Sequence, residues 1–208
     1  MSGSGFRRRD VIRSLWLSGA AAAASPAWAE ALSALAREHA HDPAPRAEPD
    51  WKPRVLSEHQ DATLVALAEA IIPETETPGA KGALVNRFVD QVLVEADPRD
   101  RAEFVRGLEW VDARCRELFG SGFAACAPAQ QTALLTIVSS PANRSLADQV
   151  GVEFFAVVKS LTISGYYSSE VGIREELGDD GTLAFVEFPG CEHPEHGAPP
   201  AAGKQSKG

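Results

Sequence analysis

Residues 97–120 have the sequence DPRDRAEFVRGLEWVDARCRELFG, which is the pattern of one long amphipathic helix. Asp97 is a favourable N-cap residue, Pro98 suits the first helical position, and Gly120 suits the end of the helix. Apolar side chains recur at helical spacing along one face, and these are Phe104, Leu108, Val111, Cys115 and Leu118. The length of this face predicts that the segment is the central helix of its domain.

Four further helices are predicted around this segment, each with apolar residues at helical spacing; they cover about residues 57–72, 85–92, 128–138 and 150–161. Ser57 and Gln60 have the spacing of a capping box at the start of the first of them. Period-2 alternation, the signature of strands, occurs only at residues 183–188, a stretch too short to carry a sheet by itself. We therefore predict an all-α domain over residues 57–190, folded as a compact bundle or orthogonal array of about five helices.

The N-terminal residues 1–29 have the organisation of an export signal. The sequence RRRDVIR at residues 7–13 precedes an apolar run at 14–24 and the small-residue site Ala27-Trp28-Ala29, which resembles a twin-arginine signal with Arg8 and Arg9 as its pair. The apolar run is about half of the roughly 20 residues that span a bilayer. We expect cleavage after Ala29 and a periplasmic protein, with an uncleaved anchoring helix as the alternative.

The segments on either side of the domain contain many proline residues. Residues 30–56 are rich in Pro, Ala and charge and are predicted to be a linker arm without regular structure, in which His39 and His41 are solvated. Residues 191–208 are predicted to form an extended, partly disordered tail.

The charge of the chain limits the partners that it can bind. The formal net charge is −9, and removal of residues 1–29 takes away four arginines and one aspartate, which makes it −12. Nucleic acid and anionic lipid headgroups attract clustered Lys and Arg. A protein or a neutral small molecule is therefore the expected partner.

Motifs for catalysis or cofactor binding are missing from the sequence. It contains no G-x-G-x-x-G after a strand, no C-x-x-C-H, no H-E-x-x-H and no G-x-S-x-G. We therefore expect no catalytic residue and no bound cofactor. Cys191, His193 and His196 are candidate ligands for zinc or copper, but a metal site also needs a fourth ligand and supporting hydrogen bonds, so a docked tail is the preferred interpretation.

The three cysteines have different surroundings in the sequence. Cys115 lies on an apolar helical face, which favours a buried thiol. Cys126 is close enough in sequence to pair with Cys115, a question that needs coordinates. Cys191 would then be the odd cysteine, available for a bond to another chain.

Both tyrosines of the chain lie in the sequence GYYSSEVG at residues 165–172. They could act as acids or bases, or pack at a helix end, but tyrosines beside adaptable polar residues are enriched at protein interfaces. We therefore predict that this segment and Cys191 contact a partner, through Tyr166, Tyr167, Ser168, Ser169, Glu170 and Cys191.

The sequence AEAIIPETETPGA at residues 68–80 resembles the opening signature of the gluconate 2-dehydrogenase subunit 3 family. Further elements of that family agree in order: Gly107-Leu108 with Asp112, Phe119-Gly120 with Phe123, Gln130-Gln131, Phe154-Phe155, Leu161-Thr162, residues 165–172 and Pro189-Gly190-Cys191. The resemblance covers about residues 57–191.

This resemblance implies a non-catalytic small subunit of a membrane-associated sugar or polyol dehydrogenase complex. Its partner would be an FAD-dependent flavoprotein of the glucose–methanol–choline type, often with a multihaem cytochrome c as a third subunit. In such complexes the flavoprotein lacks an export signal and is carried through the twin-arginine machinery by the small subunit. The implied location is the periplasm, at the cytoplasmic membrane through the complex.

Two other kinds of function stay open from the sequence alone. One is a periplasmic metal-binding protein that uses Cys191, His193 and His196. The other is a stand-alone periplasmic enzyme that uses the tyrosines and Glu170.

Overall fold

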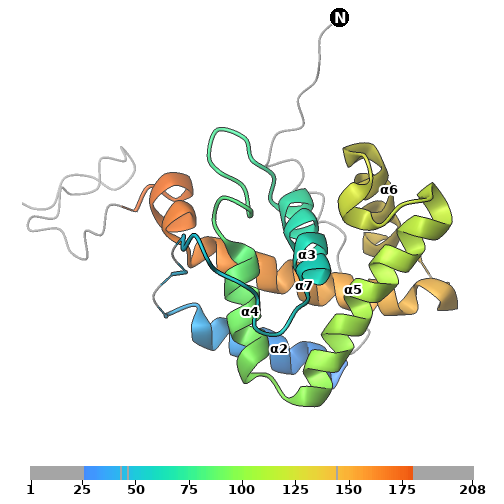
Figure 1. Ribbon diagram of the computed structural model, residues 1–208, viewed down its shortest axis with the longest axis horizontal. Helices are drawn as coiled ribbons and strands as arrows, with labels where there is room; N and C mark the ends of the chain where they lie inside the picture. The colour runs from blue at the N-terminus through green and yellow to red at the C-terminus, as the bar shows by residue number, and fades with distance from the viewer. Residues whose placement is uncertain (1–25, 43, 46, 144, 180–208) are drawn as a thin grey trace, which may run out of the picture. The chain divides into compact units, whose positions relative to one another are not determined.

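The computed structural model describes residues 26–42, 44–45, 47–143 and 145–179, which are helical and contain no strand (Figure 1). The α-helices are α2 (Ala27–His39), α3 (Glu58–Ile71), α4 (Val85–Glu95), α5 (Pro98–Phe119), α6 (Pro128–Ser139) and α7 (Gln149–Tyr167). Short 3₁₀ helices η1 (Phe123–Ala125) and η2 (Leu146–Asp148) flank α6, and a π-helix, η3 (Val171–Glu176), follows α7. The all-α prediction is confirmed for these residues.

The predicted ends of α5 are confirmed. The Asp97 side chain accepts a hydrogen bond from the backbone N–H of Arg99 at 2.8 Å, and Pro98 is the first helical residue. Gly120 ends the helix with φ of 81°, a left-handed conformation that glycine adopts without steric cost. The buried part of the predicted apolar face extends to Cys115, whereas Leu118 on the same face is 41% exposed.

The central helix is α7 and not α5, which corrects the sequence prediction. Helices α2, α3, α4, α5 and α6 all contact α7. The physical reason is the composition of the two helices: α7 carries only two charged residues, Glu153 and Lys159, whereas α5 has charged residues along its outer face. A helix that is apolar on most sides is stable only when other elements surround it.

The N-terminal part of the predicted linker arm is also a helix, so that prediction is wrong for residues 30–39, which belong to α2. Ala29, Leu32, Ala36 and His39 are buried and recur at helical spacing, and α2 packs against α4, α5 and α7. Alanine and leucine are strong helix formers, and the prolines that suggested irregular structure begin only at position 43.

His39 is buried and paired, contrary to the expectation of a solvated side chain. Its Nδ1 atom lies 2.6 Å from a carboxylate oxygen of Asp42, and its Nε2 atom lies 3.2 Å from Glu95. His41 is exposed, as expected. The described parts of residues 47–56 follow the surface of α4, where the buried Asp90 accepts hydrogen bonds from the backbone N–H groups of Arg54 and Val55.

The described residues up to Gly178 form one compact unit. Within the described part of the chain, no helix is both long and apolar enough to cross a membrane. Residues 1–25 of the proposed export signal, with Arg8 and Arg9, and the C-terminal tail, with Cys191, His193 and His196, lie outside the described residues.

Candidate functional site

The tyrosine segment at the end of α7 is largely part of the core. The Tyr166 ring is fully buried, and its hydroxyl donates a hydrogen bond to the carbonyl oxygen of Pro78 at 3.0 Å. Ser169 is buried as well, and its hydroxyl donates to the carbonyl of Tyr166 at 2.6 Å and accepts from the N–H of Gly172 at 3.0 Å. The prediction that Tyr166 and Ser169 contact a partner is therefore wrong for this conformation, because neither presents its side chain at the surface.

The other residues of that segment are accessible. Tyr167 and Ser168 are half-buried, and Glu170 is exposed beside Arg174, with 3.5 Å between their charged groups. Tyr167 contacts the buried Tyr166 edge to face, with 5.2 Å between the ring centroids. Tyr167, Ser168 and Glu170 stay predicted contacts.

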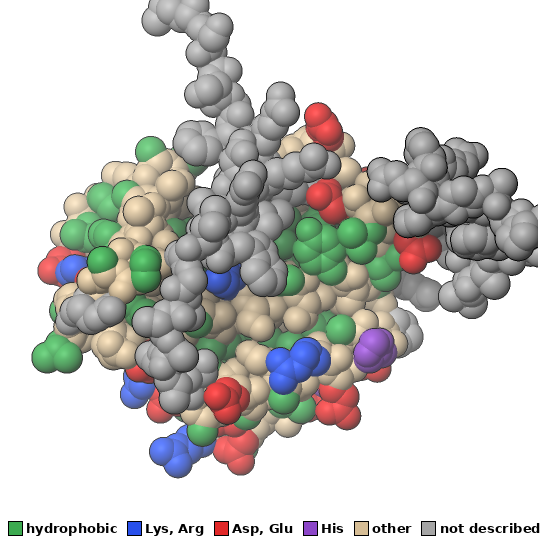
Figure 2. All heavy atoms as spheres, turned by 180° about the vertical axis from the view of Figure 1, so that it is seen from behind, with side chains coloured by type: hydrophobic (Ala, Val, Ile, Leu, Met, Phe, Trp, Pro, Cys, Tyr) green, Lys and Arg blue, Asp and Glu red, His purple; other side chains and the backbone are tan. Residues whose placement is uncertain are grey.

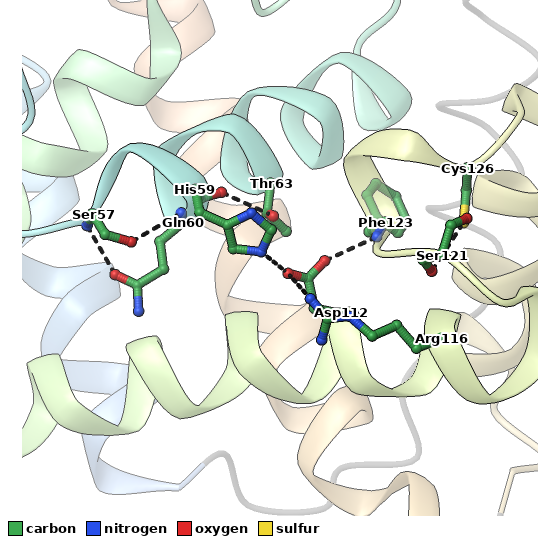
Figure 3. Close-up of polar contacts among 9 residues, drawn as sticks. All are labelled: Ser57, His59, Gln60, Thr63, Asp112, Arg116, Ser121, Phe123 and Cys126. Carbon is green, nitrogen blue, oxygen red and sulfur yellow. Dashed lines mark hydrogen bonds and ion pairs between the residues drawn. The ribbon is translucent and has the colours of Figure 1, made fainter.

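A second cluster of polar side chains joins α3, α5 and η1 (Figure 3). Asp112 on α5 is buried, and its Oδ1 atom accepts a hydrogen bond from the backbone N–H of Phe123 at 2.9 Å. Its Oδ2 atom contacts Nε2 of His59 on α3 and lies 3.4 Å from the guanidinium of Arg116. One carboxylate therefore connects three separate elements of the fold.

The same cluster borders a small pocket of about 190 Å³, lined mainly by residues of α3 and α5. A paired histidine and aspartate can act in acid–base catalysis when a nucleophile is within hydrogen-bond reach. The two hydroxyls that line this pocket contribute to α3 itself: Ser57 accepts from the N–H of Gln60 at the start of the helix, and Thr63 donates to the carbonyl of His59. The arrangement therefore serves best as a clamp between helices.

Sequence analysis did not find the partner of Asp112. His59 and Asp112 are 53 positions apart, and no local pattern connects two residues at that separation. Asp112 itself was noted only through the family resemblance.

The structure shows whether Cys115 and Cys126 form a disulfide bond. Cys115 and Cys126 are both buried and both free thiols. Burial, together with a hydrogen bond between the two side chains, raises the pKa of the Cys115 thiol to about 12. Cys115 is therefore a neutral thiol at physiological pH and a poor nucleophile, because the thiolate is the reactive form.

Metal ligands do not gather in the part of the chain that the structure describes: it contains no group of three or more His, Cys, Asp and Glu side chains able to hold an ion. A second, more open pocket of about 290 Å³ lies beside α4. There the Arg87 guanidinium stacks 4.9 Å above the Trp51 ring and donates to the carbonyl of Glu48. These contacts hold the segment before α3 against α4.

Comparison with known protein families identifies the class of this chain. Residues 58–190 match the model of the gluconate 2-dehydrogenase subunit 3 family, and the chain belongs to that family. The match confirms the resemblance seen in the sequence and implies a subunit of such a dehydrogenase complex. No curated protein and no solved structure matches the chain.

The residues that carried the resemblance make internal contacts in this structure. Asp112 holds the N–H of Phe123, and the Gln131 side chain donates to the carbonyl of the same residue at 3.0 Å. Glu69 accepts hydrogen bonds from the N–H groups of Glu74 and Lys81, at 2.7 and 2.8 Å, and so shapes the loop after α3. These signature residues therefore build the fold.

Proposed function

We propose that this chain is a non-catalytic small subunit of a periplasmic, FAD-dependent sugar or polyol dehydrogenase complex, and that it escorts the catalytic flavoprotein through twin-arginine export and stabilises it. The observation that carries the proposal is membership of the subunit 3 family over residues 58–190. The twin-arginine pattern around Arg8 and Arg9 supports the export role.

The internal contacts support an accessory role. Asp112, Gln131 and Glu69 use their polar groups to hold backbone N–H and C=O groups of the same chain. A polar group that is committed to such a contact is costly to withdraw, since it leaves a backbone group unsatisfied. In this proposal FAD is bound by the partner, and haem c belongs to a third subunit where one exists.

Co-purification tests the proposal. The full chain with an affinity tag is co-expressed with a flavoprotein of the glucose–methanol–choline type from the same source, and the product is examined by absorbance and dye-linked activity. We expect the flavin absorbance and the activity to elute with this chain at a fixed ratio. A flavoprotein that elutes separately with full activity and unchanged thermal stability would contradict the proposal.

Cys191, Tyr167, Ser168 and Glu170 stay proposed contacts with the flavoprotein. Tyr167→Ala should weaken the complex and leave the helix content unchanged, because Tyr167 is only half-buried. Tyr166→Ala is the informative comparison, since it removes a fully buried ring and should destabilise the subunit itself.

A further inference from the structure

One stretch of the chain at the surface is almost free of charge. Residues 118–147 include a single charged residue, Arg144, whereas 24% of the whole chain is charged. This segment contains η1, α6 and most of η2. We call its exposed surface the α6 face, and its exposed residues include Leu118, Pro128, Thr132, Ala133, Thr136 and Leu146.

Helix α6 has uncharged residues also on the sides that the fold does not bury. Only Leu134 and Val138 are buried among its twelve residues, and the rest of the helix carries no charged side chain. A surface helix usually has a charged or polar side opposite its buried stripe. Leu146, at the start of η2, extends the apolar surface and is 91% exposed. On the left of Figure 2, most of the coloured side chains are hydrophobic or uncharged, and acidic and basic side chains are visible only at the edge.

The polar side chains of α6 are occupied within the chain. The hydroxyls of Thr132 and Thr136 donate to carbonyls one turn earlier in the helix, at 2.9 and 2.8 Å. Gln130 accepts from the N–H of Ala127, and Gln131 donates to the carbonyl of Phe123. A partner that covers this face would therefore take few polar groups out of water without a hydrogen-bond partner. The desolvation cost of association is correspondingly small.

Charge decides between the surfaces that could cover the α6 face. An anionic membrane attracts helices with Lys and Arg on their polar side, and α6 has none. A second copy would bring together two chains that each carry a formal charge of −12 after the predicted cleavage, which repel each other. A different protein with an uncharged patch meets neither obstacle, and depletion of charged residues is the compositional mark of an interface core.

We propose that the α6 face is a docking surface for the flavoprotein subunit of the complex, in addition to the proposed contacts of Tyr167, Ser168 and Glu170 at the C-terminal end of α7. This inference rests on the proposed function, because family membership supplies the partner, and it adds the face by which the two chains bind. Leu146 is the main apolar anchor, and α6 supplies the uncharged surface.

Two charge-introducing variants of the full chain test the proposal. Ala133→Glu and Leu146→Asp each place a carboxylate on the α6 face, where a dry interface would leave it unpaired. We expect each variant to bind the purified flavoprotein at least tenfold more weakly. Ala102→Glu, at an exposed position on α5, is the matched control and should bind as the unmodified chain does. Circular dichroism and melting temperature check that all three fold.

The outcomes separate this inference from the proposed function. If the unmodified chain does not bind the flavoprotein, the proposed function fails. If it binds and both face variants bind equally well, the function stands and the α6 face is overturned. The face is also overturned if the variants change only the self-association in sedimentation velocity, or only the binding to vesicles that contain phosphatidylglycerol.

Discussion

The Phe154 ring on α7 lies directly over Gly107 on α5, so that a Cβ atom at Gly107 would overlap the ring. Phe154 also meets Phe104 edge to face, with 5.2 Å between the centroids, so it cannot move away without losing that contact. This close approach fixes how α5 crosses the central helix. Trp110 and Gly151 repeat the arrangement, with the glycine on α7.

Gly107→Ala should destabilise the protein by about 1–3 kcal/mol, the usual cost of overpacking, although alanine is the better helix former by about 1 kcal/mol. Urea unfolding measures the change. Phe154→Leu supplies the double-mutant cycle: in that background the cost of Gly107→Ala should fall, because the smaller side chain leaves room. An unchanged cost would mean that the overlap is relieved elsewhere.

Asp112→Ala should cost about 1–3 kcal/mol of stability, because it leaves the buried N–H of Phe123 without an acceptor. His59→Gln removes only the partly exposed side of the cluster, and exposed ion pairs contribute about 0–1 kcal/mol. We therefore expect Asp112→Ala to lower the unfolding midpoint clearly more than His59→Gln does. The reverse order in urea titrations would show that the histidine, and not the backbone contact, is what the carboxylate stabilises.

Asp61 should make stability depend on pH. Burial raises the pKa of Asp61, opposed by the hydrogen bond from Asn86, and the neighbouring Asp90 raises it further while Arg87 lowers it. A carboxyl with a raised folded-state pKa favours folding while it is protonated, so its contribution is lost as pH rises through that pKa.

Asp61→Asn keeps an acceptor for Asn86 and removes the ionisation. We expect this variant to be more stable than the unmodified chain at pH 7 and to lose that advantage as the pH falls into the range where aspartate is protonated. Chemical denaturation of the variant and the unmodified chain, at pH 7 and at the acidic pH, measures the difference between their free energies of unfolding. The other titrating groups contribute equally to both proteins and cancel in this difference. A constant difference across pH would contradict the assignment to Asp61.

The predicted cleavage site lies within the first turn of α2. The N–H groups of Ala29 and Glu30 both donate to the carbonyl of Pro26, at 2.9 and 3.2 Å, and the Ala29 side chain is buried. Proteases act most readily on exposed, unpaired chain. We therefore expect the Ala29–Glu30 bond of the folded protein to be cut slowly.

Leu32→Ala tests this expectation, since it should cost about 2–5 kcal/mol in the packing of α2 and so expose the bond more often. A time course with purified signal peptidase, read by mass spectrometry, should show faster cleavage of the variant. Leu177→Ala, which changes an exposed leucine, is the control. Equal rates for all three proteins would show that α2 does not protect the bond.

Local signals in the sequence were sufficient to predict the helices that begin at capping residues or at proline. The capping box of Ser57 and Gln60, the Asp97 cap and the proline starts of α5 and α6 all depend on neighbours a few positions apart. Helix α2 was missed because the prolines that follow it dominated the composition of residues 30–56.

Features that depend on distant residues were not predictable in the same way. The central position of α7 follows from packing against five other helices, and the contact of Tyr166 with Pro78 joins residues 88 positions apart. A buried tyrosine and an interface tyrosine have the same local sequence. Only the tertiary structure separates them.

Subcellular fractionation of an Arg8→Lys, Arg9→Lys double variant tests the escort role most directly. Lysine keeps the charge but lacks the planar guanidinium group, so it is not an equivalent residue at a paired-arginine site. With the flavoprotein co-expressed, we expect dye-linked dehydrogenase activity to stay in the cytoplasm and to disappear from the periplasm. Arg99→Lys, an exposed arginine on α5, is the control and should leave the periplasmic activity unchanged. Undiminished periplasmic activity in the double variant would show that the flavoprotein is exported independently, and would contradict the escort role.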